Sequence, residues 1–391
     1  MENRDVAPDD TLLKQIFNTN QPHAISIFQQ DWDKCIFKAE WEKASAPCVV
    51  RLEDEDEKKF TMIAAMHQLA AAIIPKLVPK LLQVGKARND KGRTFNFMVV
   101  DLVEGDTLEN VWQDLDHEQQ SSITNELVDA IQKLHSVRLS DDIKEILYKA
   151  FDGDTDMVKC LNQTSVFGGP HTGLLYNGTA LLESINQRRE VSEGFCTMTA
   201  TDDGQGIKIE SKFVGLEPVL LDNSDIMKWP EEAIFCHNDL APCNIIVQSS
   251  VSPNGKKLYR LSGIIDWELS GFYPAAYELS LQDTYLGCGN QHLSFYLLLK
   301  DRLKELVPRY PTQIALLRSM ELVFESHQRY LYNRGNIPAH IRKRFMQALS
   351  LTRDSDPYVG WVRRPGNEPS AEYSRADVDE LVKNVIKDMR G

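Results

Sequence analysis

Two short blocks of the sequence hold the residue types that can do chemistry. Residues 237–244 read HNDLAPCN, and residues 264–268 read IIDWE after a stretch that turns at SPNGKK. Asn244 begins the first strand of the predicted hairpin and Asp266 ends the second. Antiparallel pairing then brings them side by side, where a carboxylate and an amide oxygen can hold Mg²⁺. Asp239, on the loop leading in, can accept a hydroxyl proton as a general base.

The spacing of these residues matches a phosphoryl-transfer loop. The pattern H-x-D-x-x-x-x-N, followed by an Asp that closes a hairpin, is that of a kinase catalytic loop and its metal-binding Asp. A lone Asp or Asn beside a strand is usually a turn residue, but the motif here sits in the context its mechanism requires. We assign catalysis to Asp239 and Mg²⁺ ligation to Asn244 and Asp266. For His237 we favour a structural role, bracing the loop through a backbone hydrogen bond.

The rest of the pattern predicts an α+β fold of two lobes. Alternating residues from 24 to 52, a helix over 55–74 and two strands within 80–103 indicate a small antiparallel sheet with one helix. Amphipathic helices at 116–134 and between 293 and 350 indicate a larger, mostly helical second lobe. We therefore predict an N-terminal nucleotide-binding lobe (1–103), a helical lobe (104–350) and a C-terminal tail with a final helix (351–391). Within the helical lobe, 150–230 has weak periodicity and is interpreted as an insertion or lid.

Composition narrows the partners of the chain. A net charge of −13 disfavours nucleic acid and anionic membranes but is compatible with a cationic small molecule. The longest apolar stretch is broken by lysines and prolines, and the N-terminus lacks a secretory pattern, so we expect no membrane contact and a cytoplasmic location. The seven scattered cysteines contain no C-x-x-C pair and are expected to be free thiols. The sequence does not indicate an oligomeric state.

The two blocks also resemble a known family. FCHNDLAPCNIIV and GIIDWELSGFYPAAYE are similar to the aminoglycoside phosphotransferase and choline kinase-like family, in particular its fungal-type small-molecule kinases. Weaker similarity extends over roughly residues 20–335 and leaves the tail uncovered. The resemblance implies a protein-kinase-like fold, with small antiparallel-sheet N-lobe and larger mostly helical C-lobe. It also implies ATP and Mg²⁺ as cofactors and a small-molecule hydroxyl as acceptor.

The resemblance also assigns nucleotide-binding positions. Arg51 stands where the family places the cation that touches the ATP phosphates, although an ordinary exposed arginine at a strand end is the alternative. The family orients this cation with a helix glutamate, but residues 61–66 contain no carboxylate, and Glu57 is the nearest candidate. Asp101 and Val103 match the hinge whose backbone groups bind adenine.

Substrate contacts and one departure from the family complete the prediction. Trp267, Glu268 and Tyr273 are candidates to line the acceptor pocket, with Glu268 or Glu278 pairing a substrate amine; burial in the core is the alternative for the rings. Residues 29–33 (QQDWD) occupy the expected phosphate-covering loop without a glycine and with two acids. The leading hypothesis is an ATP-dependent small-molecule kinase, and the alternative is a catalytically impaired regulatory protein of the same fold.

Overall fold

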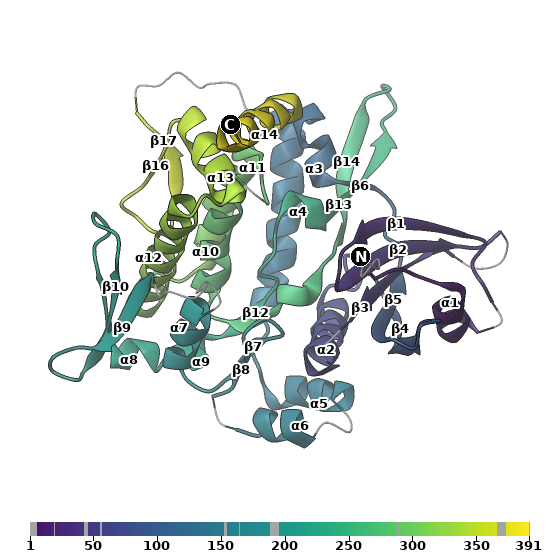
Figure 1. The fold of residues 1–391 in the computed structure, drawn as a ribbon, viewed down its shortest axis with the longest axis horizontal. Coiled ribbons are helices and arrows are strands. Elements are labelled where there is room, and N and C mark those ends of the chain that lie inside the picture. The colour runs from purple at the N-terminus through teal and green to yellow at the C-terminus, as the bar shows by residue number, and fades with distance from the viewer. Residues whose placement is uncertain are drawn as a thin grey trace.

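The computed structural model consists of two lobes joined by a short crossing segment (Figure 1). It describes residues 6–18, 20–42, 46–54, 57–151, 155–163, 165–187, 195–287, 289–365 and 373–390. The N-terminal lobe, purple to blue in Figure 1, is a small sheet, whereas the other lobe is mostly helical. The predicted α+β, two-lobed fold class is confirmed. No helix in the described part of the chain is long and apolar enough to cross a membrane.

The N-terminal lobe is built on a five-stranded antiparallel sheet in the order β1-β2-β3-β5-β4. Its strands are β1 (Ala24–Gln30), β2 (Lys34–Glu40), β3 (Cys48–Glu53), β4 (Leu81–Arg88) and β5 (Thr94–Asp101). Alternate residues of β2 are buried, as the period of two requires. They form a core with helix α1 (Asp10–Phe17), which the sequence analysis did not predict. Asp9 caps this helix by accepting a hydrogen bond from the Leu12 N–H at 2.7 Å.

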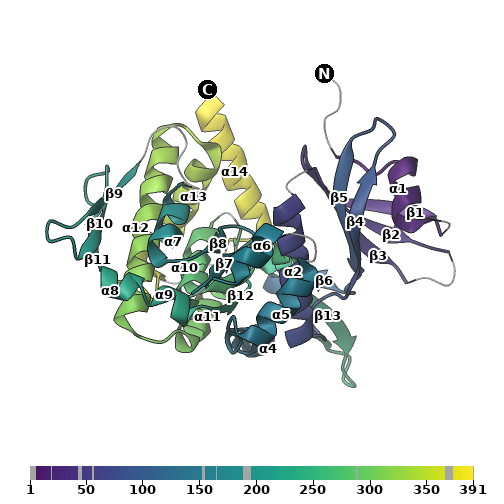
Figure 2. The same cartoon turned by 90° about the horizontal axis from the view of Figure 1, so that it is seen from below.

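Helix α2 (Glu57–Ile73) lies between the sheet and the helical lobe, as Figure 2 shows. Phe60 and Ala64 pack with Met98 of β5, whereas Met62 and Met66 belong to the core of the helical lobe. Because both sides of α2 are covered, its apolar residues do not form a single stripe. The helix therefore connects the two cores of the molecule.

The chain crosses between lobes directly after β5, beside the expected lobe boundary at residue 103. Strand β6 (Asp106–Thr107) pairs with β13 (Ile245–Val251), which in turn pairs with β14 (Lys257–Ile264). Gly105 has φ of +138°, and a Cβ at this position would collide with the carbonyl oxygen of Val247. Only glycine fits such a close backbone approach. The crossing is thereby fixed against the strand that begins after Asn244.

The helical lobe contains eleven α-helices of varied length in its described part before the tail. They are α3 (Leu108–Val111), α4 (His117–His135), α5 (Asp141–Ala150), α6 (Thr155–Leu161), α7 (Gly178–Gln187), α8 (Asn223–Ile226), α9 (Trp229–Glu232), α10 (Ala275–Tyr285), α11 (Leu293–Leu303) and α12 (Pro311–Asn333), followed by α13 (Ile337–Ala348). Four 3₁₀ turns also occur, η1 (Trp112–Asp114), η2 (Pro242–Asn244), η3 (Trp267–Leu269) and η4 (Lys304–Leu306). Helix α10 is buried along almost its whole length at the centre of this lobe.

The segment 150–230 holds short strands that weak periodicity could not reveal. Strands β7 (Phe167–Gly169) and β8 (Gly173–Leu175) join β12 (Ile234–Cys236) and β15 (Gly271–Tyr273) in the order β12-β15-β7-β8. A second sheet, β9 (Cys196–Ala200), β10 (Gly206–Ser211) and β11 (Val219–Asp222), lies against α12. The first of these sheets carries β12, which leads into the segment 237–244.

The C-terminal tail is part of the helical lobe. Hairpin β16 (Leu351–Arg353) and β17 (Trp361–Arg363) precedes α14 (Arg375–Arg390), which packs on α13. Arg353 donates to Asp283 at 2.9 Å, and the buried Lys300 does so at 2.6 Å. Burial opposes ionisation of Asp283, but the two cations more than offset it and lower the pKa of the carboxyl. The tail thus completes a buried ion cluster at the end of α10.

Replacing Arg353 by Met is predicted to lower the free energy of unfolding by about 3 kcal/mol, because it removes one partner of a buried charge. The measurement is urea denaturation. The matched control is Arg344→Met, which breaks the exposed Arg344–Asp388 pair and is expected to cost less than about 1 kcal/mol. Equal losses in the two variants would show that the tail does not anchor α10.

Candidate active site

A buried carboxylate holds the segment 237–244 in place. Glu278, on α10 and 1% exposed, accepts hydrogen bonds from the backbone N–H groups of His237 and Asn238 at 2.7 and 2.8 Å. Its second oxygen lies 2.7 Å from Nε2 of His135 on α4. Burial raises the pKa of Glu278, but the hydrogen bond and charge of His135 and the backbone donors outweigh it, so the net shift is downward. The interpretation of Glu278 as a partner for a substrate amine is therefore wrong, because both oxygens are engaged.

Asn238 has a left-handed backbone conformation, with φ of 66°. The side chain of Asn238 donates to the carbonyl of Leu269 at 2.9 Å, and the hydroxyl of Tyr285 donates to the backbone carbonyl of Asn238. This conformation is uncommon for residues other than glycine and is held here from several sides. The turn at Asn238 directs the chain from β12 into Asp239.

His237 connects the two motif blocks through its ring. The N–H of Asp239 donates to Nδ1 at 3.1 Å, which leaves Nε2 to donate to the carbonyl of Ile265 at 3.0 Å. Burial lowers the pKa of His237 to about 4, so the ring is neutral at pH 7. This geometry is that of a brace between Asp239 and the residue before Asp266, in keeping with the structural role we favoured for His237.

The structure brings Asp239, Asn244 and Asp266 together. The side-chain amide of Asn244 donates to the carbonyl of Asp239 at 3.1 Å. Ile245 is paired with Ile264 at the end of the hairpin, and the N–H of Ile265 donates to the carbonyl of Asn244 at 2.9 Å. Asn244 and Asp266 therefore flank the last pair of the hairpin, as the sequence predicted. Asp266 has φ of 62° and ψ of 71°, which turns its backbone sharply out of the strand.

The electrostatic setting of Asp239 suits a proton acceptor. Burial raises its pKa to about 7, assisted by the negative charge of Asp266 and opposed by the hydrogen bond from Asn244. Burial and the neighbouring Glu268 also raise the pKa of Asp266. A general base works best when its pKa lies near the operating pH. In the metal-free protein, burial of Asp239 and the neighbouring charge of Asp266 thus raise its pKa toward neutrality.

Arg51 lies at the junction of the two lobes. It is only 6% exposed, which excludes the ordinary exposed arginine considered as the alternative. Its guanidinium pairs with Glu53 at 2.7 Å, with Asp266 at 3.4 Å and closely with Glu268. Lys34, at the start of β2, adds a second cation 3.2 Å from Glu268. Burial opposes the charge of Arg51, but the three carboxylates outweigh it and raise its pKa.

These pairs show which carboxylates orient Arg51 in place of the helix glutamate that the resemblance led us to expect. Glu53 and Glu268 orient Arg51, whereas the side chain of Glu57 lies outside the described residues. Glu268 is consequently engaged by two cations of the N-terminal lobe rather than open toward a substrate amine. Sequence reasoning missed Glu53 and Lys34. The period of two along β3, which puts Glu53 on the same face as Arg51, was the signal available for Glu53.

The aromatic candidates lie in the core. Trp267 is 2% exposed, donates from its indole to the carbonyl of Ile264 at 3.1 Å and stacks with Phe235. Tyr273 is fully buried, and its hydroxyl shares a hydrogen bond with Thr172 at 2.7 Å. The alternative of core packing therefore holds for both rings, because neither faces an open space in this structure.

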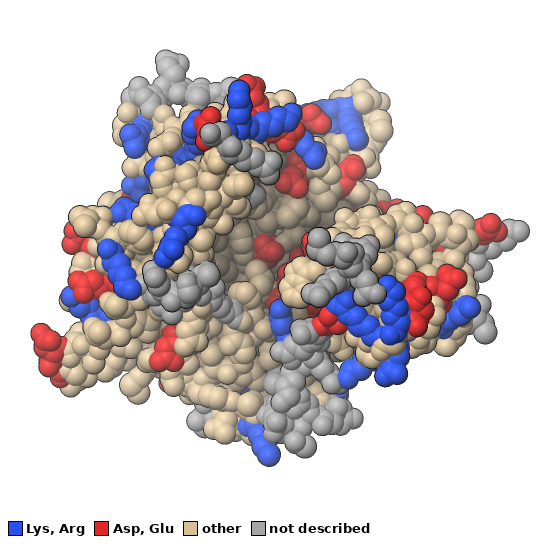
Figure 3. Space-filling view, in the orientation of Figure 1, with Lys and Arg blue, Asp and Glu red and all other residues tan. Residues whose placement is uncertain are grey.

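The expected hinge residues lie where β5 leaves the sheet. The N–H of Asp101 donates to the carbonyl of Lys80 at 3.0 Å, and Asp101 itself is exposed. Val103 packs over Gly263 of β14. Figure 3 shows a hollow between the lobes, with acidic side chains inside it. The segment 101–103 thus lies at the junction between the lobes, as do the carboxylates of Asp239, Asp266 and Glu268.

The stretch that holds both motif blocks matches a known enzyme family. The model of the phosphotransferase enzyme family matches residues 220–296, which contain both motif blocks. This match confirms the predicted resemblance over that stretch and agrees with the predicted enzyme class, a small-molecule kinase. No curated protein sequence matches the chain.

Solved structures with a similar outline share little sequence with the chain. A thermostable mutant of the aminoglycoside phosphotransferase APH(4)-Ia, in complex with AMP-PNP and hygromycin B, is 15% identical, with 87% of this chain and 99% of that chain covered and a TM-score of 0.48. Aminoglycoside 2'-phosphotransferase-IIIa in its GDP complex is 11% identical, with 97% of each chain covered and a TM-score of 0.38. An ethanolamine kinase of Plasmodium vivax is 12% identical, with 97% and 84% covered and a TM-score of 0.35.

In metal-free protein, the carboxyl of Asp239 is predicted to titrate near pH 7, and NMR of the side-chain carboxyl carbons is the measurement. Its folded-state pKa exceeds the unfolded value, so ionisation destabilises the fold. That cost is absent below about pH 4 and is complete above about pH 7. In the Glu268→Gln variant the same titration is expected at lower pH, because one repelling charge is removed. A wild-type titration near pH 4 would contradict the assignment.

Proposed function

We propose that the protein transfers the γ-phosphate of ATP to a hydroxyl group of a small molecule, with Asp239 as general base and Asn244 and Asp266 as Mg²⁺ ligands. The observation that carries the proposal is that the two motif blocks meet. The side chain of Asn244 is hydrogen-bonded to the backbone of Asp239, and Asp266 lies at the end of the hairpin that follows Asn244. Phosphoryl transfer needs chiefly positioning and charge stabilisation, and a rigid loop beside a metal site supplies both.

The donor set fits Mg²⁺. Asp266 and Asn244 offer a carboxylate and an amide oxygen, which are the hard ligands that this ion prefers. Burial, together with the charges that Asp239, Asp266 and Glu268 place close to one another, raises the pKa of the first two. A divalent cation relieves such repulsion and, when bound, neutralises charge on the transferred phosphate. Asp239 would accept the proton of the acceptor hydroxyl while the oxygen of that hydroxyl attacks the γ-phosphorus and ADP leaves.

Arg51 is proposed to bind the nucleotide phosphates. Its weakest contact, 3.4 Å to Asp266, is the one that a phosphate oxygen could replace with least loss, and Glu53 and Glu268 would keep the guanidinium oriented. The turn after β1, which the sequence analysis expected to cover the phosphates, contains Asp31. The carboxylate of Asp31 accepts a hydrogen bond from Gln29 at 2.7 Å. Adenine is proposed to contact the backbone of 101–103, other than the N–H of Asp101, which is already used.

The acceptor is proposed to approach from the hollow between the lobes. With Glu268 and Glu278 engaged, a cationic group of the acceptor needs another carboxylate. Glu109, at the start of α3, is exposed. Glu109 lies near the thiol of Cys243. Burial, helped by the charge of Glu109, raises the pKa of that thiol to about 11. Glu109 is therefore our candidate on the acceptor side. A hydroxyl-bearing amine is the acceptor class that agrees with the net charge of −13.

The proposal is tested by measuring ADP release from purified protein with Mg²⁺ and ATP across a panel of amine and sugar-alcohol metabolites. We expect one class of compound to stimulate release, and the stimulation to be lost in Asp266→Ala, which removes a metal ligand. Calorimetry with MgATP accompanies the assay. An absence of both stimulated release and MgATP binding would instead favour the alternative of a catalytically impaired protein.

A further inference from the structure

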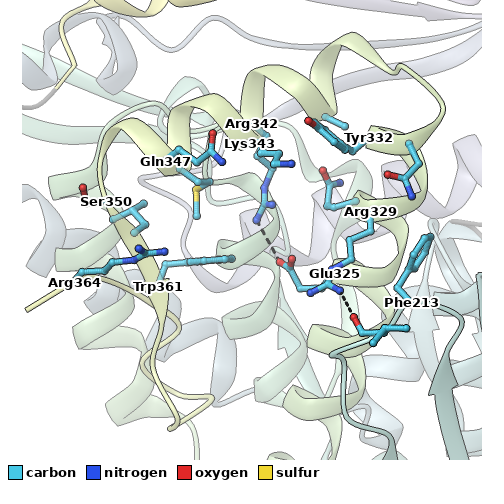
Figure 4. Close-up of a pocket in the computed structure, with 16 residues that line it drawn as sticks. Phe213, Glu325, Arg329, Tyr332, Arg342, Lys343, Gln347, Ser350, Trp361 and Arg364 are labelled. Atoms are coloured by element: carbon cyan, nitrogen blue, oxygen red, sulfur yellow. Dashed lines mark hydrogen bonds and ion pairs between the residues drawn. The ribbon is translucent and has the colours of Figure 1, made fainter.

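A cavity on the helical lobe contains none of the residues assigned to the active site above. It measures about 750 Å³ and is enclosed by α12, α13, the residues after β10 and the β16–β17 hairpin. Figure 4 shows side chains from these elements converging on one space. The volume falls within the range of cavities that hold a small molecule. The residues used below to describe its chemistry are Glu325, Arg329, Tyr332, Arg342, Lys343, Trp361 and Arg364.

The inner wall of the cavity contains arginine and tryptophan side chains. Arg342, which is 5% exposed, points from α13 toward Glu325, and the two are 3.7 Å apart, longer than a hydrogen bond (Figure 4). Its guanidinium also lies 5.6 Å from the centre of the Trp361 ring. The indole nitrogen of Trp361 is buried and has no hydrogen-bond partner among the residues that the structure describes. The wall therefore includes a planar ring beside a buried cation.

The rim of the cavity is basic. Arg329, Lys343 and Arg364 are exposed and line it, and none of the three forms an ion pair with a carboxylate within the described ranges. Arg329 donates to the carbonyl of Val214 at 2.8 Å, and the ammonium of Lys343 lies 3.6 Å from the centre of the Tyr332 ring. These contacts keep the cations near the opening without neutralising them.

The charge of the cavity contrasts with that of the chain. Four cationic side chains line it with one carboxylate, Glu325, although the whole chain carries a net charge of −13. Glu325 is shared with Arg353, whose Nη2 lies 3.8 Å away. Like charges gathered around a concave, partly apolar space attract an anion, and arginine suits phosphate and carboxylate groups because of its planar fork.

We propose that this cavity is a second small-molecule site, which binds an anion attached to a planar ring. The anionic group would lie among Arg342, Lys343 and Arg364, and the ring would lie beside Trp361. The inference goes beyond the proposed phosphotransfer and does not depend on it. Phosphate monoesters and carboxylates share the required chemistry, and the experiment distinguishes them.

The test is isothermal titration calorimetry with 1-naphthyl phosphate in the presence of saturating MgAMP-PNP, which fills any nucleotide site. We expect saturable 1:1 binding. Two further titrations compare 1-naphthoate, which reports whether a carboxylate suffices, and 1-naphthol, which lacks the charge. Loss of a charge-assisted hydrogen bond should weaken binding by at least about tenfold, so 1-naphthol is expected to bind that much more weakly.

Variants locate the site. Lys343→Glu with Arg364→Glu is expected to raise the Kd for 1-naphthyl phosphate at least about tenfold, and Lys343→Ala to raise it less. The matched control is Lys228→Glu, at an exposed position outside the cavity. Melting temperatures verify that the variants fold. The proposal is overturned by absence of saturable binding up to about 1 mM, by equal affinity in the rim variants and wild type, or by equal affinity for 1-naphthol.

Discussion

The buried carboxylate of Glu278 is the interaction on which the rest of the site depends. It accepts two backbone N–H groups and pairs with His135, so its desolvation is offset by three donors. With Glu278 in place, the turn at Asn238 is fixed, His237 bridges to Ile265, and Asp239 is presented beside the end of the hairpin. Removing the carboxylate would leave two buried N–H groups unsatisfied and release the loop.

Helix α10 extends this arrangement through the helical lobe. Glu278 is in its first turn, and Asp283 in its last turn is paired with Lys300 and Arg353. A buried charge therefore anchors each end of the helix. The tail residue Arg353 also approaches Glu325 in the basic cavity at 3.8 Å. Elements far apart in sequence are thus connected to the catalytic loop through one buried helix.

The contact between the lobes depends on a second cluster of charges. Lys34 and Arg51 of the N-terminal lobe meet Glu268 of the helical lobe, and Arg51 also reaches Asp266. Arg51, which is proposed to bind phosphate, is therefore beside Asp266, which is proposed to hold Mg²⁺. Binding of a nucleotide would require these pairs to be rearranged, because Asp266 cannot retain its full contact with Arg51 while ligating a metal.

Much of this organisation was predictable because it is local in sequence. The spacing in 237–244 and the hairpin that follows place Asn244 and Asp266 without knowledge of the fold. The roles of Glu278 and Glu268 were not predictable, because their partners lie on α4 and on β2 and β3, far away along the chain. Burial of Trp267 and Tyr273 likewise follows from how β12, β15 and β7 pair. Helix α1 was missed because it is short and its apolar face is completed only by the sheet.

The most direct test of the central claim compares wild type with Asp239→Asn in two measurements, the affinity for MgATP and single-turnover transfer of phosphate to the acceptor. The substitution keeps the shape of the side chain but removes the base. We predict a Kd for MgATP within about threefold of wild type and a transfer rate lower by about 10²- to 10⁴-fold. Transfer at the wild-type rate would contradict the assignment of Asp239 as the general base.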